Sequence, residues 1–376
     1  MKGKAIAKAN QVMKLEDGFY KVASQRGNGS YSVTRRENGS WKCECMDYYY
    51  RCYVLHQITR CKHIWAVEFS QAVANEVQVT VIEPITGIHE CVYCKSTKIV
   101  RDGIRHNKSG AIQLFNCLAC GRYFSFNIGF ERMKHNPHAV TTAMQLYFSG
   151  ESLRNTARSL RLLGVQVTHK TVFMWIKKYT ALMGRHVEQI TPNVSNTWRA
   201  DEMFLKVKGN MKYLYALMDD ETRFWIAQQV ASTKYTADVQ PLFQKGEVIA
   251  AKKPKTLITD GAPNFHEAYM REFWTSNVES RPEHIREIRI NGQVHNNKME
   301  RLNGQIRDRE RVMRTLEKAD TPILTGMQIY HNFIRPHKGL GYRTPAQAAG
   351  IEVQGEDKWL TLIQDASKKT NERPKR

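Results

Sequence analysis

Three features are scarce in this 376-residue sequence: long apolar runs, acidic residues, and cysteines beyond residue 120. No run of about 18 apolar residues exists, so the sequence predicts no membrane-spanning helix. The basic start MKGKAIAKAN leads into the polar run QVMKLEDGFY and not into the apolar core of a signal peptide. We therefore expect a soluble, intracellular protein.

Acidic residues are outnumbered, because 36 Asp and Glu stand against 57 Lys and Arg and give a formal net charge of +21. Disorder does not explain this excess, since 41% of the residues are hydrophobic and 25% are charged, as in ordinary globular proteins. A basic, foldable chain binds polyanions, because neutralising phosphates releases their condensed counterions. Nucleic acid is the expected partner, and an anionic membrane surface is the weaker alternative.

The eight cysteines all lie before residue 121 and are too few for a disulfide scaffold. In the first cluster, Cys43 and Cys45 are followed after 15 residues by Cys61 and His63. Three thiolates and one imidazole suit tetrahedral zinc, and a closed set of four ligands leaves no open position for catalysis. The pattern resembles the SWIM zinc finger, which we assign to residues 1–80. Incidental core cysteines with a surface histidine are the alternative, and Cys52 has no assigned role.

The second cluster pairs Cys91 and Cys94 with Cys117 and Cys120 across 22 residues. Each C-x-x-C places two sulfurs on one turn, so the two pairs predict a four-cysteine zinc ribbon over residues 88–127, with redox dithiols as the alternative. The two clusters together predict two structural Zn²⁺ ions. Arg122 and other basic and aromatic residues around the ribbon suit either a nucleic-acid surface or a solvated face.

Residues 136–182 show the apolar spacing of three short helices, with Pro137 at a first turn and Thr168 as an N-cap. A turn before the last helix favours a helix-turn-helix DNA-binding domain, and an amphipathic three-helix linker is the alternative. In the first interpretation, DNA contacts come from the positions outside the packing face of the last helix. These positions are Lys170, Phe173 and Lys177.

Beyond residue 192, strand-like and helix-like runs alternate and indicate an α/β sheet with helices on its faces, over residues 192–350. The polar, basic segment 365–376 is expected to be a tail. The expected strands are 198–207, 213–218, 224–229, 256–259 and 285–290, and the expected helices are near 236–247, 264–274 and 294–316.

Three carboxylates fall where an α/β sheet brings them to one edge: Asp201 in a strand, Asp260 directly after one, and Glu300 on a later helix. They repel one another unless cations neutralise them, so they predict a site for two Mg²⁺ or Mn²⁺ ions. Two metals about 4 Å apart promote in-line phosphoryl transfer. Asp260 precedes a glycine and is also compatible with a plain turn. The acids that compete for the three roles are Glu202, Asp219, Asp220 and Glu310.

At these residues the chain resembles the DDE transposases of prokaryotic insertion sequences, in particular the insertion-sequence-six group. The matching runs are WRADE with KGNMKYLYALMD, LITDGAPNF, HNNKMERLNGQIRDRE and YHNFIRPHKGLGYRTPAQAAG. The resemblance spans about residues 90–350 and implies an RNase H-like mixed sheet, as in retroviral integrases. In this family a Lys or Arg follows the glutamate by seven positions, a place that Arg307 occupies for contact with DNA. The 39 residues between Asp260 and Glu300 slightly exceed the usual spacing, and a SWIM-like N-terminus is uncommon.

The resemblance implies a polynucleotidyl transferase that binds double-stranded DNA at the terminal inverted repeats of its element. It would free 3′-hydroxyls by Mg²⁺-dependent hydrolysis and direct them at target DNA, in the cytoplasm at the nucleoid. Bringing two ends together implies a homo-oligomer, at least a dimer. The charge excess is then assigned to DNA binding, which leaves the membrane alternative without support. A nuclease of the same fold that cuts without joining and a transposase-derived regulator without catalysis are the alternatives.

Overall fold

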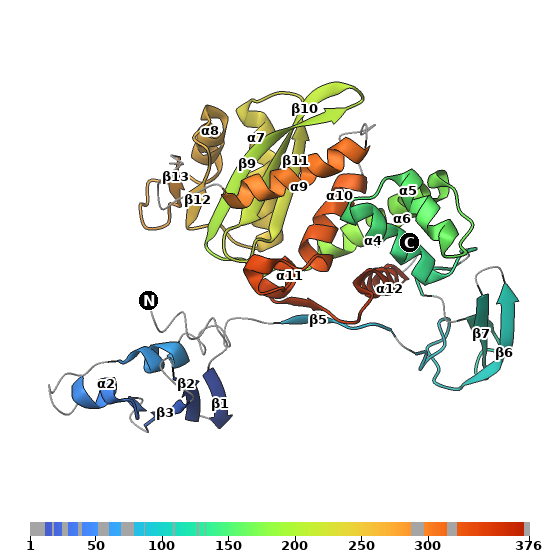
Figure 1. Cartoon of the computed structure of the whole chain (residues 1–376), viewed down its shortest axis with the longest axis horizontal. Coiled ribbons are helices and arrows are strands. Elements are labelled where there is room, and N and C mark those ends of the chain that lie inside the picture. Colours follow the sequence, from blue (N-terminus) through green and yellow to red (C-terminus); the bar gives the residue numbers. More distant parts are fainter. Residues whose placement is uncertain are drawn as a thin grey trace. The chain divides into compact units, whose positions relative to one another are not determined.

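The computed structural model forms two compact units, Met1–Gln78 and Val79–Arg376 (Figure 1). Among the described helices, none combines the length and the apolar composition needed to cross a bilayer. The structure describes residues 12–16, 19–24, 29–36, 40–51, 60–68, 79–85, 87–107, 110–125, 128–131, 133–286, 297–313 and 322–371.

The first unit contains a four-stranded antiparallel sheet with its strands in sequence order. Alternation along β2 turns Tyr20 and Val22 inward, where they pack with Val33 and with buried cysteines. Cys52 lies outside the described residues. The elements are β1 (Val12–Glu16), β2 (Phe19–Ala23), β3 (Ser30–Arg35), β4 (Trp41–Cys43), the short helix α2 (Met46–Tyr49) and a helix at residues 62–68.

The second unit begins with β5 (Thr80–Ile82), which pairs in parallel with β14 (Ile351–Val353) near the other end of the chain. The cysteine-bearing segment that follows forms a three-stranded antiparallel sheet with a small core around Phe124. Its strands are β6 (Ile99–Asn107), β7 (Gly110–Cys117) and β8 (Tyr123–Ser125).

Three helices occupy the stretch where the sequence predicted them, and local hydrogen bonds start each one. Asn136, Ser152 and Thr168 each accept a bond from a backbone N–H of the first turn, which satisfies one of the donors that a helix start leaves free. The last helix extends five residues beyond the expected end at 182. The helices are α4 (Pro137–Ser149), α5 (Leu153–Leu162) and α6 (His169–Val187).

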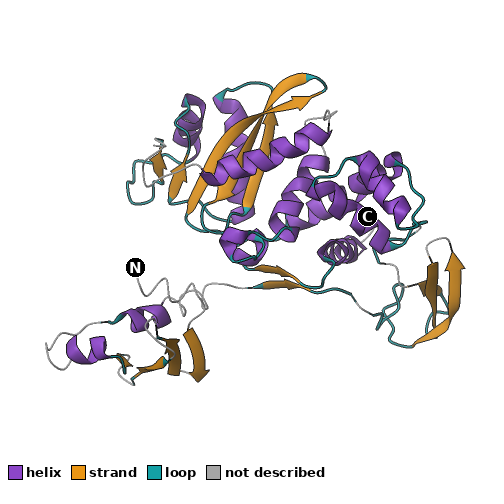
Figure 2. Ribbon diagram, in the orientation of Figure 1, coloured by secondary structure: helices purple, strands orange, loops and turns teal. Residues whose placement is uncertain are grey.

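A five-stranded mixed sheet in the order β11-β10-β9-β12-β13 lies at the centre of this unit. The pairings among β9, β10 and β11 are antiparallel, whereas β12 runs parallel to both β9 and β13. Helices lie on both faces of the sheet (Figure 2), which confirms the predicted α/β class. The elements are β9 (Thr197–Val207), β10 (Asn210–Asp219), β11 (Trp225–Ala231), α7 (Thr236–Ala250), β12 (Thr256–Ile258), α8 (Pro263–Glu272), β13 (Glu283–Ile285) and α9 (Asn297–Met313).

Two predicted boundaries fall on residues that the structure does not describe. Near the expected strand at 285–290, β13 pairs with β12 over Glu283–Ile285, and residues 287–290 lie outside the described residues. The expected helix at 294–316 is described as α9 over Asn297–Met313, and the residues beyond both of its ends are likewise outside the described part.

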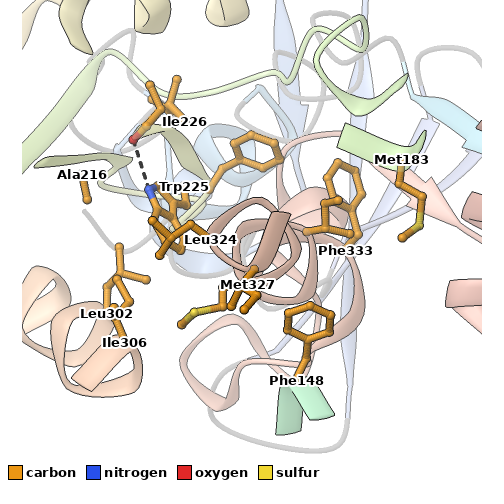
Figure 3. Close-up of a cluster of buried hydrophobic side chains, with 14 of the residues drawn as sticks. Phe148, Met183, Ala216, Trp225, Ile226, Leu302, Ile306, Leu324, Met327 and Phe333 are labelled. Atoms are coloured by element: carbon orange, nitrogen blue, oxygen red, sulfur yellow. Dashed lines mark hydrogen bonds between the residues drawn. The ribbon is translucent and has the colours of Figure 1, made fainter. Parts of the chain in front are cut away.

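One hydrophobic core joins the three helices to the sheet (Figure 3). Phe148 of α4 and Met183 of α6 belong to the same cluster as Trp225 of β11 and Leu302 of α9. The Nε1 of Trp225 donates a 3.1 Å hydrogen bond to the carbonyl of Ala227, so this large ring is buried without losing its polar partner. The stretches 136–182 and 192–350, which the sequence predicted as separate domains, both contribute side chains to this core, and the division into domains stays a prediction.

The C-terminal segment contradicts the tail predicted for residues 365–376. Helix α12 (Lys358–Asn371) continues through residue 371, because Trp359, Leu362, Ile363 and Ala366 recur at helical spacing and are buried. Residues 372–376 lie outside the described residues. The remaining elements are α10 (Pro322–Ile329), the π-helical turn η2 (Tyr330–Ile334), the 3₁₀ turn η3 (Lys338–Leu340) and α11 (Pro345–Ala348).

Candidate active site and metal centres

The central strand β9 continues past the end of its parallel neighbour β12. Their pairing ends with Ile258 opposite Arg199, so two more residues along each strand bring Asp260 level with Asp201. Successive side chains of a strand leave from opposite faces, and because β12 has ended, both Asp201 and Glu202 reach Asp260. The three residues offer ligand oxygens that all lie within 4.8 Å of one another. Ligand sites of α/β sheets form at such strand ends.

Asp201 is held by two hydrogen bonds. The backbone N–H of Glu202 donates to its Oδ1 at 2.9 Å, and Nδ2 of Asn303 donates to its Oδ2 at 2.9 Å. Burial raises the pKa of Asp201 to about 6, and the nearby carboxylates of Asp260 and Glu202 add to this effect against the two hydrogen bonds. A cation at this cluster would favour the ionised form, so the arrangement fits a metal site.

Glu202 was named from the sequence only as a neighbour that competes with Asp201. In the structure it belongs to the carboxylate cluster, and its Oε1 pairs with Nζ of Lys234 at 2.6 Å. The Lys234 ammonium also lies over the rings of Phe204 and Tyr213, at 5.4 and 4.9 Å from their centroids. No local sequence signal could have placed Glu202 here, because its position depends on where β12 ends.

Asp260 lies on an exposed turn between β12 and α8. Its Oδ1 accepts a 3.1 Å hydrogen bond from the backbone N–H of Ala262. Gly261 follows with a φ of +85°, and a Cβ there would lie 2.4 Å from the carbonyl oxygen of Arg286. Only glycine fits that backbone conformation. The structure therefore confirms the turn interpretation of Asp260, and its role in a metal site stays a prediction.

Glu300 lies on the first turn of α9 and is exposed. Among the described residues, it is not part of the group whose ligand oxygens lie within 4.8 Å. Residues three apart on a helix share a face, so Glu300 lies on the same side of α9 as Asn303, the donor to Asp201. Arg307 is exposed two turns further along this helix. The structure thus joins two of the three predicted acids directly and places the third on the adjoining helix.

Polar contacts fasten α9 to the sheet on both sides of Asn303. Nζ of Lys298 donates to Oδ1 of Asp220 at 2.7 Å, and Oε1 of Glu310 accepts from the backbone N–H of Lys206 at 2.6 Å. Asp220 also pairs with Arg199. Burial would raise the pKa of Asp220, but the hydrogen bonds and charges of Lys298 and Arg199 lower it. These contacts give Asp220 and Glu310 structural roles.

Asp219, another competing acid, is fully buried and uses both oxygens within the fold. Its Oδ1 accepts from the N–H and Oγ of Ser195 at 2.8 and 2.6 Å, and its Oδ2 accepts from the N–H and Oγ1 of Thr222 at 2.7 and 2.6 Å. Burial raises the pKa of Asp219. Both of its oxygens therefore accept hydrogen bonds from the segments that flank β9 and β11.

The first cysteine cluster meets as the spacing predicted. Cys43, Cys45, Cys61 and His63 are buried, and their ligand atoms lie within 4.8 Å of one another. The His63 ring stacks on Tyr31 with centroids 4.6 Å apart, and its Nε2 is buried without a hydrogen-bond partner among the described residues. Hydrogen bonds from Cys43 and Cys61 lower the pKa of the Cys45 thiol. The Nδ1 of His63 lies 3.8 Å from Sγ of Cys43, so the imidazole faces the thiols in a set of four ligands that fits zinc.

The second cysteine cluster also meets. The Sγ atoms of Cys91 and Cys120 lie 3.7 Å apart, and those of Cys94 and Cys117 lie 3.5 Å apart. These distances are far longer than the roughly 2.05 Å of a disulfide. They match the edge of about 3.8 Å that tetrahedral Zn–S bonds of about 2.3 Å require. Both cysteine clusters therefore suit structural zinc.

The residues expected to contact DNA are at the surface. Arg122 is exposed, and its guanidinium lies over the Tyr93 ring at 5.1 Å. Lys170, Phe173 and Lys177 lie on the exposed side of α6, whereas Val172, Trp175 and Ile176 of the same helix are buried. The packing face and the free face of α6 are therefore as the periodicity predicted, and DNA binding by them stays a prediction.

Comparison with known proteins agrees with the motifs. A family model described as a DDE domain matches residues 195–337. A transposase for the insertion sequence-like element IS431mec of Staphylococcus aureus is 29% identical over 139 residues, which cover 36% of this chain and 60% of that protein. The transposase of IS257 in transposon Tn4003, also from Staphylococcus aureus, matches equally well. The chain thus spans 60% of the length of these relatives.

Two solved structures are also similar to parts of the chain. One is the HTLV-2 integrase catalytic core domain in complex with magnesium, with a TM-score of 0.30, 16% identity, and coverage of 43% of this chain and 98% of that one. The other is a simian T-cell lymphotropic virus intasome in complex with PP2A regulatory subunit B56 gamma, with a TM-score of 0.33, 13% identity, and coverage of 55% and 74%.

The segment matched by the family model contains the mixed sheet and all three predicted acids. Its Asp201 and Asp260 meet at the end of β12, and its Glu300 lies on the helix that contacts Asp201. The resemblance predicted from the sequence is therefore confirmed for this part of the chain. Residues 195–337 match the DDE-domain family model, and 139 residues of the chain are similar to transposases of insertion sequences.

Proposed function

We propose that this protein is a transposase that cuts the DNA ends of its own element and joins them to target DNA. The observation that carries the proposal is the meeting of Asp201 and Asp260 at the end of β12, beside the helix of Glu300. Carboxylates gathered in this way are costly unless cations neutralise them.

Asp201, Asp260 and Glu300 would hold two Mg²⁺ or Mn²⁺ ions, since carboxylate oxygens are the ligands that these hard cations prefer. The bound ions would activate the attacking oxygen and stabilise the leaving oxygen of an in-line displacement at phosphorus. The chain itself fixes the orientation of Asp201 through Asn303 and the Glu202 N–H. Arg307, exposed on the same helix, suits a DNA phosphate.

The reaction has two displacements. In the first, a water oxygen attacks the phosphorus at the element end, and the 3′-oxygen leaves and takes a proton. In the second, this 3′-hydroxyl attacks a target phosphodiester, loses its proton, and displaces a target 3′-oxygen. Neither step requires a covalent bond between DNA and protein.

DNA binding would draw on the charge excess of +21. The zinc modules and the exposed residues of α6 would bind double-stranded DNA at the terminal inverted repeats, and Arg122 would add a basic contact beside an aromatic ring. Two ends must be held together for transposition, which requires at least a dimer. These properties suit a protein that acts at the nucleoid.

The test uses DNA that carries the sequences flanking this coding region on both sides, with a target plasmid and Mg²⁺. We expect cleavage that leaves 3′-hydroxyls, followed by joined products, and loss of both in Asp201→Asn and Asp260→Asn. Glu247→Gln on α7 is the control, because it removes a carboxylate outside the cluster. Cleavage without joining would support the nuclease alternative, and specific binding without cleavage would support the regulator.

A further inference from the structure

Glu202 has no assigned role, yet it lies inside the carboxylate cluster. It offers an oxygen within 4.8 Å of the ligand oxygens of Asp201 and Asp260, and only 9% of its side chain is exposed. A charged group buried this deeply is costly unless opposite charge matches it. Lys234 provides part of that match through Oε1.

The second oxygen of Glu202 has no such match. Its Oε2 is buried and has no hydrogen-bond partner among the described residues. Lys234 is itself fixed by the rings of Phe204 and Tyr213, so it holds the carboxylate in place through the other oxygen. Buried polar atoms normally find a partner, and one that lacks a protein partner in a cluster of acids indicates a missing cation.

The charge balance of the cluster agrees with a divalent ion. When Asp201, Glu202 and Asp260 are ionised, they carry three negative charges, and Lys234 neutralises part of this charge through its ion pair with Glu202. The Lys234 ammonium lies 2.6 Å from Oε1 of Glu202, so it acts on that oxygen of the carboxylate. A divalent cation would neutralise more of the negative charge of the cluster.

We propose that Glu202 is a direct ligand of a divalent cation at this site, and that Lys234 is the residue that positions it. The inference rests on the proposed function, because it adds a ligand to the metal site formed by Asp201 and Asp260. It gives β9 two metal ligands from its two faces, gathered around the end of β12. Mg²⁺ and Mn²⁺ suit a set of carboxylate oxygens of this kind.

The test measures Mn²⁺ binding to the full-length, zinc-loaded protein without DNA, by the electron paramagnetic resonance signal of free Mn²⁺. We expect Glu202→Gln to weaken Mn²⁺ affinity by roughly tenfold or more. Glu247→Gln is a matched control and should bind Mn²⁺ as the unchanged protein does. Like Glu202, Glu247 pairs with a lysine, Lys253 at 3.7 Å, and has a buried oxygen without a partner among the described residues, but it lies outside the cluster.

Two further variants make the result decisive. Asp201→Asn tests the metal site itself, so unchanged Mn²⁺ affinity in that variant overturns the proposed function as well. If Asp201→Asn weakens binding while a folded Glu202→Gln variant keeps full affinity, only the role of Glu202 is overturned. Glu202→Asp keeps the charge next to Lys234, so it replaces Glu202→Gln in the test if that variant fails to fold. We expect it to bind Mn²⁺ more weakly, and full affinity overturns the inference.

Discussion

Asn303 on α9 donates a 2.9 Å hydrogen bond to Oδ2 of Asp201, which lies 102 residues earlier in the chain. This bond joins the helix of Glu300 to the strand of the first acid, so it sets the distance across which the two can share a site. Lys298 and Glu310 fasten the same helix to the sheet on either side. The helix is held by polar contacts as well as by its buried Leu302 and Ile306.

The bond predicts that Asn303→Ala slows DNA cleavage by roughly tenfold to a hundredfold, because groups that orient metal ligands contribute on that scale. Asp201 would keep its carboxylate but lose the donor that fixes it. The measurement is the single-turnover cleavage rate on end DNA at saturating protein. Gln305→Ala is the control, since position 305 lies two residues further along α9 and points elsewhere. Equal rates in the two variants would contradict a positioning role for Asn303.

The two cysteine clusters predict about two zinc ions per chain, measured by atomic emission on protein purified without added metal. Cys117→Ser should remove one of them and melt the small sheet of β6–β8, because the buried core of that sheet is built around its cysteines. Cys52→Ser is the control and should keep both ions, since the sequence spacing assigns Cys52 to neither set of four ligands. A zinc content unchanged by Cys117→Ser would refute the ribbon as a metal site.

Local signals made much of this fold readable from the sequence. Thr168 and Pro137 mark helix starts by chemistry that acts within one turn, and the predicted helices begin there. The two cysteine clusters were equally readable, because ligand spacing reflects a local turn. Asp201 and Asp260 were predicted from a strand, a strand end and the resemblance to DDE transposases, and their carboxylates do meet.

Features set by distant contacts were not readable. The role of Glu202 depends on β12 ending two residues before Asp260, which is a matter of pairing between strands. The described pairing of β13 with β12 covers Glu283–Ile285, so it begins before the strand predicted at 285–290. The basic tail at 365–376 was predicted from the polar composition of that segment. In the structure α12 continues to Asn371, and the burial of its Ile363 and Ala366 in the core stabilises it.

Helix α10 approaches α4 and α6 closely at Gly326. A Cβ at this position would lie 2.2 Å from Cζ of Phe148 and 2.7 Å from Cγ2 of Thr180. We expect Gly326→Ala to lower the free energy of unfolding by about 1–3 kcal/mol, because overpacking outweighs the better helix propensity of alanine. Gly304→Ala on α9 is the matched control, since nothing lies within 4 Å of its Cβ, and it should raise stability by up to about 1 kcal/mol. Urea unfolding of both variants measures this difference. An unchanged free energy of unfolding in Gly326→Ala would show that the helices move apart to accommodate the added methyl group.

Buried histidines predict a loss of stability in acid. Burial lowers the pKa of His331 from 6.5 to about 3, with the charges of His337 and Arg335 adding to it, and burial lowers the pKa of His337 to about 4. As the pH falls from 6.5 to 4, these histidines bind protons in the unfolded chain but stay neutral in the folded chain. The free energy of unfolding therefore decreases as the pH is lowered, by up to about 1.4 kcal/mol per pH unit for each histidine. The stabilising contribution of each histidine is complete above pH 6.5.

His331→Gln tests this dependence on pH, because glutamine does not titrate and can still donate to the carbonyl of Arg223, which lies 3.0 Å from Nε2 of His331. We expect the variant to lose less stability between pH 6.5 and 4.5 than the unchanged protein, measured by urea unfolding followed through tryptophan fluorescence. All the zinc ligands stay in place, so the difference between the two proteins isolates His331. His106→Gln on the exposed surface of β6 should keep the full pH dependence. Identical pH profiles for His331→Gln and the unchanged protein would mean that His331 takes up its proton without unfolding the core.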